Sequence, residues 1–292
     1  MEPTFFDVPV AGGDLRVARF GNGPRTVLGI HGVTASSMSM APLAHQLGPD
    51  VTLVAPDLRG RGGSNRLPGP FGMGAHADDC AAVLDHLQTG PVVVVGESMG
   101  AFVAVVLAAD HPALVERVVL VDGGLPPPLP EGIDVDQVLD AVLGPAIARL
   151  RQTFPNEDAY LDFWRAHPAL QEDWSDDIEA YLRYDLEPAD GGGLKSKVSE
   201  DAVRADGAQN VTDVDVVGDA LRALTCPVNL LRATRGLLNQ PVPLLPDFVV
   251  DTWRPNLPQL VDEVVDDTNH YTICFGERGA KVVAERVVAG GA

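Results

Sequence analysis

Short, almost unbroken apolar runs recur along the chain and alternate with segments of helical periodicity. The alternating apolar and polar residues at 5–10 and 15–20, joined through Gly12-Gly13, predict an antiparallel hairpin at the edge of a sheet. Later runs are too continuous for burial on one face only, which predicts parallel strands covered on both faces. These inner strands are predicted at residues 26–30, 51–54, 91–95, 118–121 and 228–231, and a last strand is predicted at residues 263–265.

Helical patterns between these strands predict a mostly parallel α/β sheet with helices on both faces, built through right-handed crossovers. The helices are predicted at residues 38–47, 74–87, 101–109 and 279–288. The alternation breaks after Leu125, where Pro126-Pro127-Pro128 opens a stretch of acidic amphipathic segments. We interpret residues 125–220 as an inserted helical cap, and residues 1–124 and 221–292 as the two parts of one core.

Composition narrows the classes of function. The 292 residues are 46% apolar and carry a formal charge of −20, which argues against disorder and against nucleic acid or anionic membranes as partners. Residues 125–220 hold 21 acidic and 7 basic side chains, and a solvated helical surface is a commoner meaning than steering of cations. Three widely spaced cysteines, no signal-peptide pattern and no apolar run of transmembrane length favour a reduced, cytoplasmic protein.

The strongest chemical signal is Gly96-Glu97-Ser98-Met99-Gly100, a G-x-S-x-G placed between a predicted strand and a predicted helix. A sharp turn at Ser98 needs small residues on either side, and it would present the hydroxyl at the carboxyl edge of the sheet. The same turn leaves the Met99 N–H at a helix start, where it can stabilise an oxyanion. The alternative is a glycine-rich turn with an incidental serine.

A second segment, His31-Gly32-Val33-Thr34, follows the predicted strand at residues 26–30. With this segment the chain resembles the α/β-hydrolase superfamily, whose His-Gly-x segment supplies the other oxyanion-hole N–H. The resemblance assigns that N–H to Val33 and makes His31 an organiser of its loop. It extends to Asp57-Leu58-Arg59-Gly60-Arg61-Gly62-Gly63-Ser64, which is similar to the family's largely structural D-x-R-G-x-G-x-S loop.

The resemblance also indicates the general base. His270 follows the last predicted strand, where the family carries its catalytic histidine, and an imidazole with a pKa near ~6.5 can take and return a proton at neutral pH. The other histidines, at positions 45, 76, 86, 111 and 167, fall on helical or turn patterns and need no function. A purely structural role for His270 is the alternative.

The carboxylate of the triad is the point at which the sequence departs from the family's usual pattern. The family commonly places it a few residues after the strand at 228–231, where this chain has no acid before Asp247. Haloalkane dehalogenases and zearalenone-type lactonases carry it at the end of the preceding strand, where this chain has Asp122. We favour Asp122, and Asp247 or Asp251 are the alternatives that the sequence leaves open.

Together these features imply a serine hydrolase that cleaves a small to medium, uncharged or hydrophobic ester or lactone through an acyl-enzyme. Alternatives on the same fold are a carbon–carbon bond hydrolase, a cofactor-free haloperoxidase and a non-catalytic ligand-binding homologue. No cofactor or metal is expected, since Gly60-Arg61-Gly62-Gly63 lacks a phosphate-loop pattern and Asp78-Asp79 beside His76 is expected on an exposed helical turn. The only predicted partner is a small-molecule substrate; its identity and the oligomeric state do not follow. Most of the cap aromatics are expected to pack, though any could line the pocket: Phe154, Phe163, Trp164, Trp174, Tyr181 and Tyr184.

Overall fold

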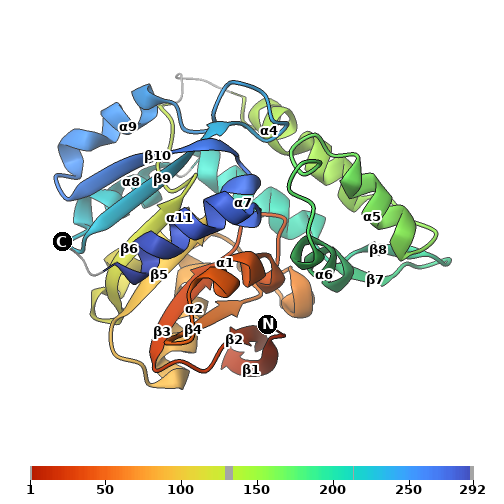
Figure 1. Cartoon of the computed structure of the whole chain (residues 1–292), viewed down its shortest axis with the longest axis horizontal. Coiled ribbons are helices and arrows are strands. Elements are labelled where there is room, and N and C mark those ends of the chain that lie inside the picture. Colours follow the sequence, from red (N-terminus) through yellow and green to blue (C-terminus); the bar gives the residue numbers. More distant parts are fainter. Residues whose placement is uncertain (1, 129–133, 213, 290–292) are drawn as a thin grey trace.

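An eight-stranded sheet forms the centre of the computed structural model, which describes residues 2–128, 134–212 and 214–289 (Figure 1). Its strand order is β1-β2-β4-β3-β5-β6-β9-β10. The first two strands form the predicted antiparallel hairpin, and the pairs from β4 to β10 are all parallel, which confirms the predicted α/β class. The strands are β1 (Thr4–Val10), β2 (Gly13–Phe20), β3 (Arg25–Ile30), β4 (Val51–Pro56), β5 (Val92–Glu97), β6 (Val115–Val121), β9 (Val228–Arg235) and β10 (Leu260–Asn269).

The inner strands of this sheet are continuous apolar runs because both faces of the sheet are covered there. Along β5, Val92 and Val94 pack into the hydrophobic cluster on one face, and Val93 and Val95 pack into the cluster on the other. This alternation follows from the two-residue repeat of a strand. With covered faces on both sides, there is no polar position to interrupt the run.

Helices from different parts of the chain cover the two faces. The cluster on one face takes side chains from α2 (Met73–Leu87), α3 (Met99–Asp110), α8 (Val214–Ala223) and α9 (Asp247–Trp253). The opposite cluster takes them from α1 (Ala41–Gln46), α10 (Thr272–Phe275) and α11 (Glu277–Val288). Short 3-10 helices lie at Ser37–Met40, Gly62–Ser64, Pro112–Leu114 and Arg254–Asn256.

Part of the segment between β6 and β9 lies at one end of the sheet, where Figure 1 shows α5 and α6 beside the small β7–β8 hairpin. Its helices begin with side-chain caps that the sequence supplies: Asn156 accepts the Ala159 N–H and Ser175 accepts the Ile178 N–H. The expected boundary at residue 220 falls within α8, whose Val217 and Leu221 pack with the core cluster. We use the name cap for the elements of this segment before α8, which are α4 (Val135–Leu150), α5 (Glu157–Arg165), α6 (Asp176–Tyr184), β7 (Leu186–Pro188), β8 (Leu194–Ser196) and α7 (Glu200–Thr212).

One expectation for α2 is wrong. Asp79 was expected on an exposed turn, yet it is buried and accepts two hydrogen bonds from Arg59, at 2.6 and 2.8 Å. The reason is that this side of α2 faces the loop after β4, so the carboxylate needs a buried counter-charge. Asp78, one position earlier, does face solvent and contacts His111 at 3.0 Å.

Among the helices that the structure describes, none combines the length and the apolar character that crossing a bilayer requires.

The close packing around Gly100 can be tested by measuring the stability of alanine variants. Gly100→Ala is expected to lower the free energy of unfolding by about 1–3 kcal/mol, because the added carbon would lie 2.1 Å from the Ile30 carbonyl oxygen. Gly74→Ala, in the first turn of α2, meets nothing within 4 Å and is expected to be neutral or to gain at most about 1 kcal/mol. Chemical denaturation of both variants beside the parent measures the difference. Equal stabilities would contradict close packing at Gly100.

Candidate active site

Ser98 lies at a sharp turn between β5 and α3. Its backbone has φ 54° and ψ −117°, a conformation that costs a non-glycine residue about 1–3 kcal/mol. Neighbouring glycines permit the turn: a side chain at Gly96 would lie 2.2 Å from the Gly100 oxygen, and one at Gly100 would press on β3. The sequence therefore forms the turn because strand and helix can approach only at glycine.

The end of β6 supports this turn from the other side. The Ser98 N–H donates to the Val121 oxygen at 2.9 Å, and a side chain at Gly123 would lie 2.2 Å from the Ser98 oxygen. Asp122, between these two contacts, has φ 46°. The backbone at the end of β6 is thus packed directly against the turn that carries the serine.

His270 and Asp122 meet at the carboxyl edge of the sheet. The His270 Nδ1 lies 2.7 Å from Asp122 Oδ2, and the other carboxylate oxygen accepts the Ala233 N–H at 3.1 Å. Both side chains are buried. Burial lowers the pKa of His270, but the hydrogen bond and charge of Asp122 outweigh it, and the net shift is upward.

The two alternative acids lie elsewhere. Asp247 is largely exposed and pairs with Arg232 at 2.9 Å. Asp251 is also exposed and lies 3.7 Å from Arg254. Of the three acids considered from the sequence, Asp122 is the one that contacts His270.

Asn269 organises the loop that carries the histidine. Its side-chain oxygen accepts the N–H groups of Tyr271 and Thr272, both at 2.9 Å. Its amide group donates to the Ala169 oxygen in the cap at 3.0 Å. The direction in which His270 points is therefore set by a local side-chain turn that also touches the cap.

The His-Gly segment lies beside the serine. A side chain at Gly32 would come within 3.3 Å of Ser98 Cβ. His31 bridges two loops: it accepts the Leu58 N–H at Nε2 over 3.0 Å, so the proton resides on Nδ1, which donates to the Gly32 oxygen over 2.8 Å. Burial lowers its pKa to about 3, so His31 stays neutral. Because the Gly32 carbonyl and the Val33 N–H belong to one planar peptide, this bond orients that N–H.

Met99 is the first residue of α3 and directly follows the serine. Its N–H precedes the first intrahelical hydrogen bond, so it has no acceptor within the helix. Met99 and the Gly32-Val33 segment thus both adjoin Ser98, and the role of their N–H groups as an oxyanion hole stays a prediction.

Glu97, directly before Ser98, is a candidate that reasoning from the sequence missed. Its Oε1 lies 3.5 Å from His270 Nε2, and it is hydrogen-bonded to the Gly32 backbone. Burial, helped by the Asp122 charge, raises the pKa of this carboxyl to about 7. The middle positions of G-x-S-x-G accept many residue types, so the available signal was only an acid directly beside the nucleophile.

A series of aromatic ring contacts connects the cap with His270. Trp164 makes an edge contact with Tyr271, with ring centroids 6.3 Å apart, and Tyr271 lies 5.9 Å from the His270 ring. Tyr184 instead stacks on Phe5 of the hairpin. Of the aromatics named from the sequence, Trp164 is therefore connected to the site, whereas Tyr184 holds the cap to β1.

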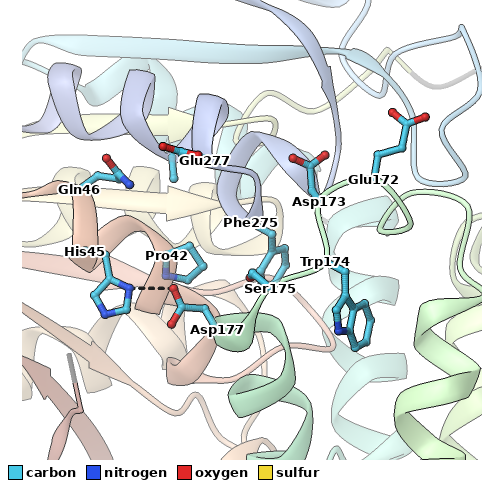
Figure 2. Close-up of a pocket in the computed structure, with 11 residues that line it drawn as sticks. Pro42, His45, Gln46, Glu172, Asp173, Trp174, Ser175, Asp177, Phe275 and Glu277 are labelled. Atoms are coloured by element: carbon cyan, nitrogen blue, oxygen red, sulfur yellow. Dashed lines mark hydrogen bonds and ion pairs between the residues drawn. The ribbon is translucent and has the colours of Figure 1, made fainter.

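A cavity of about 320 Å³ lies apart from Ser98 and His270. It is lined by residues of α1, of α11 and of the cap loop before α6 (Figure 2). Figure 2 shows several acids around it, with Asp177 hydrogen-bonded to His45 at 2.7 Å. Neither Ser98 nor His270 lines it. Within the described ranges, no group of three His, Cys, Asp or Glu side chains could hold a metal ion.

Comparison with known proteins relates the whole arrangement to one family. A family model described as alpha/beta hydrolase fold matches residues 25–167. Lipase LipV of Mycobacterium tuberculosis is 44% identical over 131 residues, which are 44% of this chain and 48% of the lipase, so this match spans about half of each protein. The 2-(acetamidomethylene)succinate hydrolase of Mesorhizobium japonicum is 31% identical over 257 residues, covering 88% of this chain and 85% of that enzyme.

Solved structures agree over nearly the full length. The crystal structure of E-2-(acetamidomethylene)succinate hydrolase has a TM-score of 0.78 and 25% identity, and the match covers 98% of both chains. The thioesterase domain from the curacin biosynthetic pathway has a TM-score of 0.77 at 18% identity, covering 99% of this chain and 100% of that one. The second likeness concerns the fold alone.

The contact between His270 and Asp122 can be tested without a substrate. Asp122→Asn is expected to lower the pKa of His270 below its ordinary value, because burial, which disfavours the imidazolium, is then opposed only by Glu97. An NMR titration of the imidazole measures the shift, and Asp251→Asn serves as a remote control. An unchanged pKa in Asp122→Asn would contradict the pairing.

Proposed function

Because this chain belongs to the α/β-hydrolase superfamily, we propose that it is a serine hydrolase acting on a small to medium, uncharged or hydrophobic carboxylic ester or lactone. The observation that carries the proposal is the 2.7 Å contact of His270 with Asp122 at the sheet edge that also holds the strained Ser98 turn. A serine in such a turn, a buried histidine and an orienting acid are the parts that acyl transfer requires.

In the first step, His270 Nε2 takes the Ser98 hydroxyl proton while Oγ attacks the ester carbonyl carbon. The carbonyl electron pair moves to oxygen, and the N–H groups of Val33 and Met99 stabilise the oxyanion. As the oxyanion collapses, the C–O bond to the leaving alcohol breaks and the imidazolium returns its proton to that oxygen. Asp122 keeps the imidazole oriented and stabilises its charged form.

In the second step, His270 takes a proton from water, whose oxygen attacks the acyl carbon. The carbonyl electron pair again moves to oxygen and the same N–H groups hold it. Collapse breaks the bond to Ser98 Oγ, which recovers its proton from the imidazolium, and the carboxylic acid leaves. No external oxidant or cofactor enters this balance.

Aromatic contacts between the cap and His270 support the proposal of a hydrophobic substrate. Trp164 and Tyr271 connect the cap interior to His270, and such aromatic surfaces favour apolar groups. The name of the mycobacterial relative, a lipase, agrees with an ester bond, and the name of the Mesorhizobium relative specifies a succinate derivative. We propose an uncharged ester rather than a succinate derivative because Glu97 lies beside His270. When ionised, its carboxylate repels an anionic group near the scissile bond.

Hydrolysis of p-nitrophenyl esters and simple lactones tests the proposal. Ser98→Ala and His270→Ala are expected to abolish turnover above background, and Asp122→Asn is expected to lower kcat by about 10⁴-fold. Asp247→Asn, whose carboxylate pairs with Arg232, is expected to leave kcat unchanged.

Labelling by a fluorophosphonate gives a second readout, because only an activated serine reacts. We expect the parent protein to be labelled at Ser98 and the Ser98→Ala variant to remain unlabelled. A parent protein that neither hydrolyses any ester or lactone nor takes the label would contradict the proposal and favour a non-catalytic ligand-binding protein.

Glu97 predicts a pH-dependent substrate preference. Because its pKa is raised to about 7, the carboxyl is neutral below that pH and repels anionic acyl groups above it. For p-nitrophenyl esters whose acyl chains end in methyl or in sulfonate, the kcat/KM ratio of sulfonate to methyl is expected to fall roughly tenfold between pH 6 and 8. Titration of His270 affects kcat/KM for both esters alike, so its effect cancels in this ratio.

Glu97→Gln is expected to make this ratio independent of pH. Glu263→Gln is the matched control, since Glu263 lies on β10 and pairs with Arg286 at 2.7 Å. A ratio that falls equally in all three proteins would assign the pH dependence to another group.

A further inference from the structure

Two fully buried charged side chains join the core to the cap. Arg61 lies in the loop after β4, and Asp206 lies on α7, with the Arg61 Nη1 at 2.6 Å from Asp206 Oδ2. Removing one partner of such a pair leaves an uncompensated buried charge, which strongly destabilises the folded state. The pair therefore ties the position of α7 to that of the loop.

The remaining contacts of Arg61 lead to both residues of the proposed oxyanion hole. Its Nε donates to the Val33 oxygen at 3.0 Å. Its Nη2 lies 4.0 Å from the Met99 sulfur, and Nη1 also donates to the Arg59 oxygen at 2.8 Å. A planar guanidinium bound at this many points has one orientation, so its contact with Val33 is fixed as well.

Val33 is consequently held through the peptides on both sides. His31 donates to the carbonyl of the peptide that precedes Val33, which is the peptide that contains the Val33 N–H. Arg61 donates to the carbonyl of the peptide that follows. Two fixed peptide planes around one Cα fix its φ and ψ, and with them the direction of the N–H.

Asp206 is in turn seated at the start of α2. Its Oδ1 accepts the Gly72 N–H at 2.6 Å, and Oδ2 contacts His76 Nε2 at 3.0 Å. Gln209, on the same cap helix, accepts the Met73 N–H at 2.6 Å. The cap thus supplies the acceptors that the first N–H groups of α2 lack, and the partial positive charge there favours an ionised Asp206.

We propose that Arg61 is a positioning residue for the oxyanion hole, and that its ion pair with Asp206 couples the seating of cap helix α7 to the geometry of that hole. The inference rests on the proposed function. It assigns to the second arginine of the Asp57-Leu58-Arg59-Gly60-Arg61 loop a role in stabilising the transition state, which goes beyond the largely structural role expected for the loop.

The neighbouring pair Arg59–Asp79 provides a matched control. It comes from the same loop, is also buried, and has an N–O distance of 2.6 Å. The Arg59 side chain reaches Pro68 and not the Val33 carbonyl. A variant of this pair therefore reports what loss of a buried ion pair does to stability when the oxyanion residues are not contacted.

The experiment compares Arg61→Lys, the double variant Arg61→Met with Asp206→Asn, and Asp79→Asn. The lysine variant keeps the charge and loses the Nε bond, whereas the double variant leaves no unpaired buried charge and stays testable where a single change unfolds the protein. Both are expected to lower kcat by about 10- to 100-fold with KM within about threefold. This is less than the loss of an oxyanion donor itself, about 100- to 1000-fold.

Two readouts distinguish positioning from general loosening. Inhibition by a trifluoromethyl ketone, which mimics the tetrahedral adduct, is expected to weaken by the same factor as kcat. Amide hydrogen exchange in residues 31–36 is expected to be faster in the Arg61 variants and unchanged in Asp79→Asn.

Equal losses of kcat in Asp79→Asn and in the Arg61 variants would overturn the inference, as would a rise in KM at constant kcat or an unchanged exchange rate in residues 31–36. The results distinguish failure of the proposed function from failure of the positioning role of Arg61. A parent protein without hydrolysis and without Ser98 labelling overturns the proposed function, whereas Ser98-dependent hydrolysis that is insensitive to Arg61 overturns the positioning role alone.

Discussion

The positive-φ turn at Ser98 is the constraint on which the rest of the site depends. It is sterically unfavourable and persists only because β3, β6 and α3 all approach it at glycine, through Gly100, Gly123 and Gly96. That approach requires β5 to lie between β3 and β6, which is the observed order of the parallel sheet. The same order brings the loops after β3, β5 and β6 to one edge, so the arrangement of strands and the chemistry of the edge have a common cause.

The position of the acid follows from the neighbouring strand. β6 pairs with β9, so a carboxylate at the end of either strand can approach the same histidine. Here β9 continues to Arg235, which binds Asp267 and Asn239, so the end of that strand is occupied by a basic residue and its own partners. Asp122 meets the histidine from β6 instead. A chain with no acid directly after β9 can therefore still supply a carboxylate to His270.

The sequence predicted the strands and the serine turn because these features depend on local periodicity and on short spacings, whereas the choice of His270 also needed the resemblance. It did not reveal Glu97, Arg61 or the burial of Asp79, whose roles depend on partners far along the chain. Arg61 and Asp206 are 145 positions apart, and an acid on an amphipathic helix is read as solvent-facing unless its counter-charge is known. Favouring Asp122 over Asp247 required the resemblance, since neither spacing nor composition distinguishes two acids that follow different strands.

Part of the cap's negative charge is structural and does not face solvent. Asp206 binds Arg61 in the core, while Tyr184 of the cap donates to Asp57 at 2.6 Å. These contacts converge on the loops after β3 and β4, which include Val33. Other cap residues reach the histidine side, where the Ala169 carbonyl accepts from the loop of His270. Because polar contacts demand a defined geometry whereas apolar ones tolerate sliding, a cap seated through both kinds takes one position over both halves of the site.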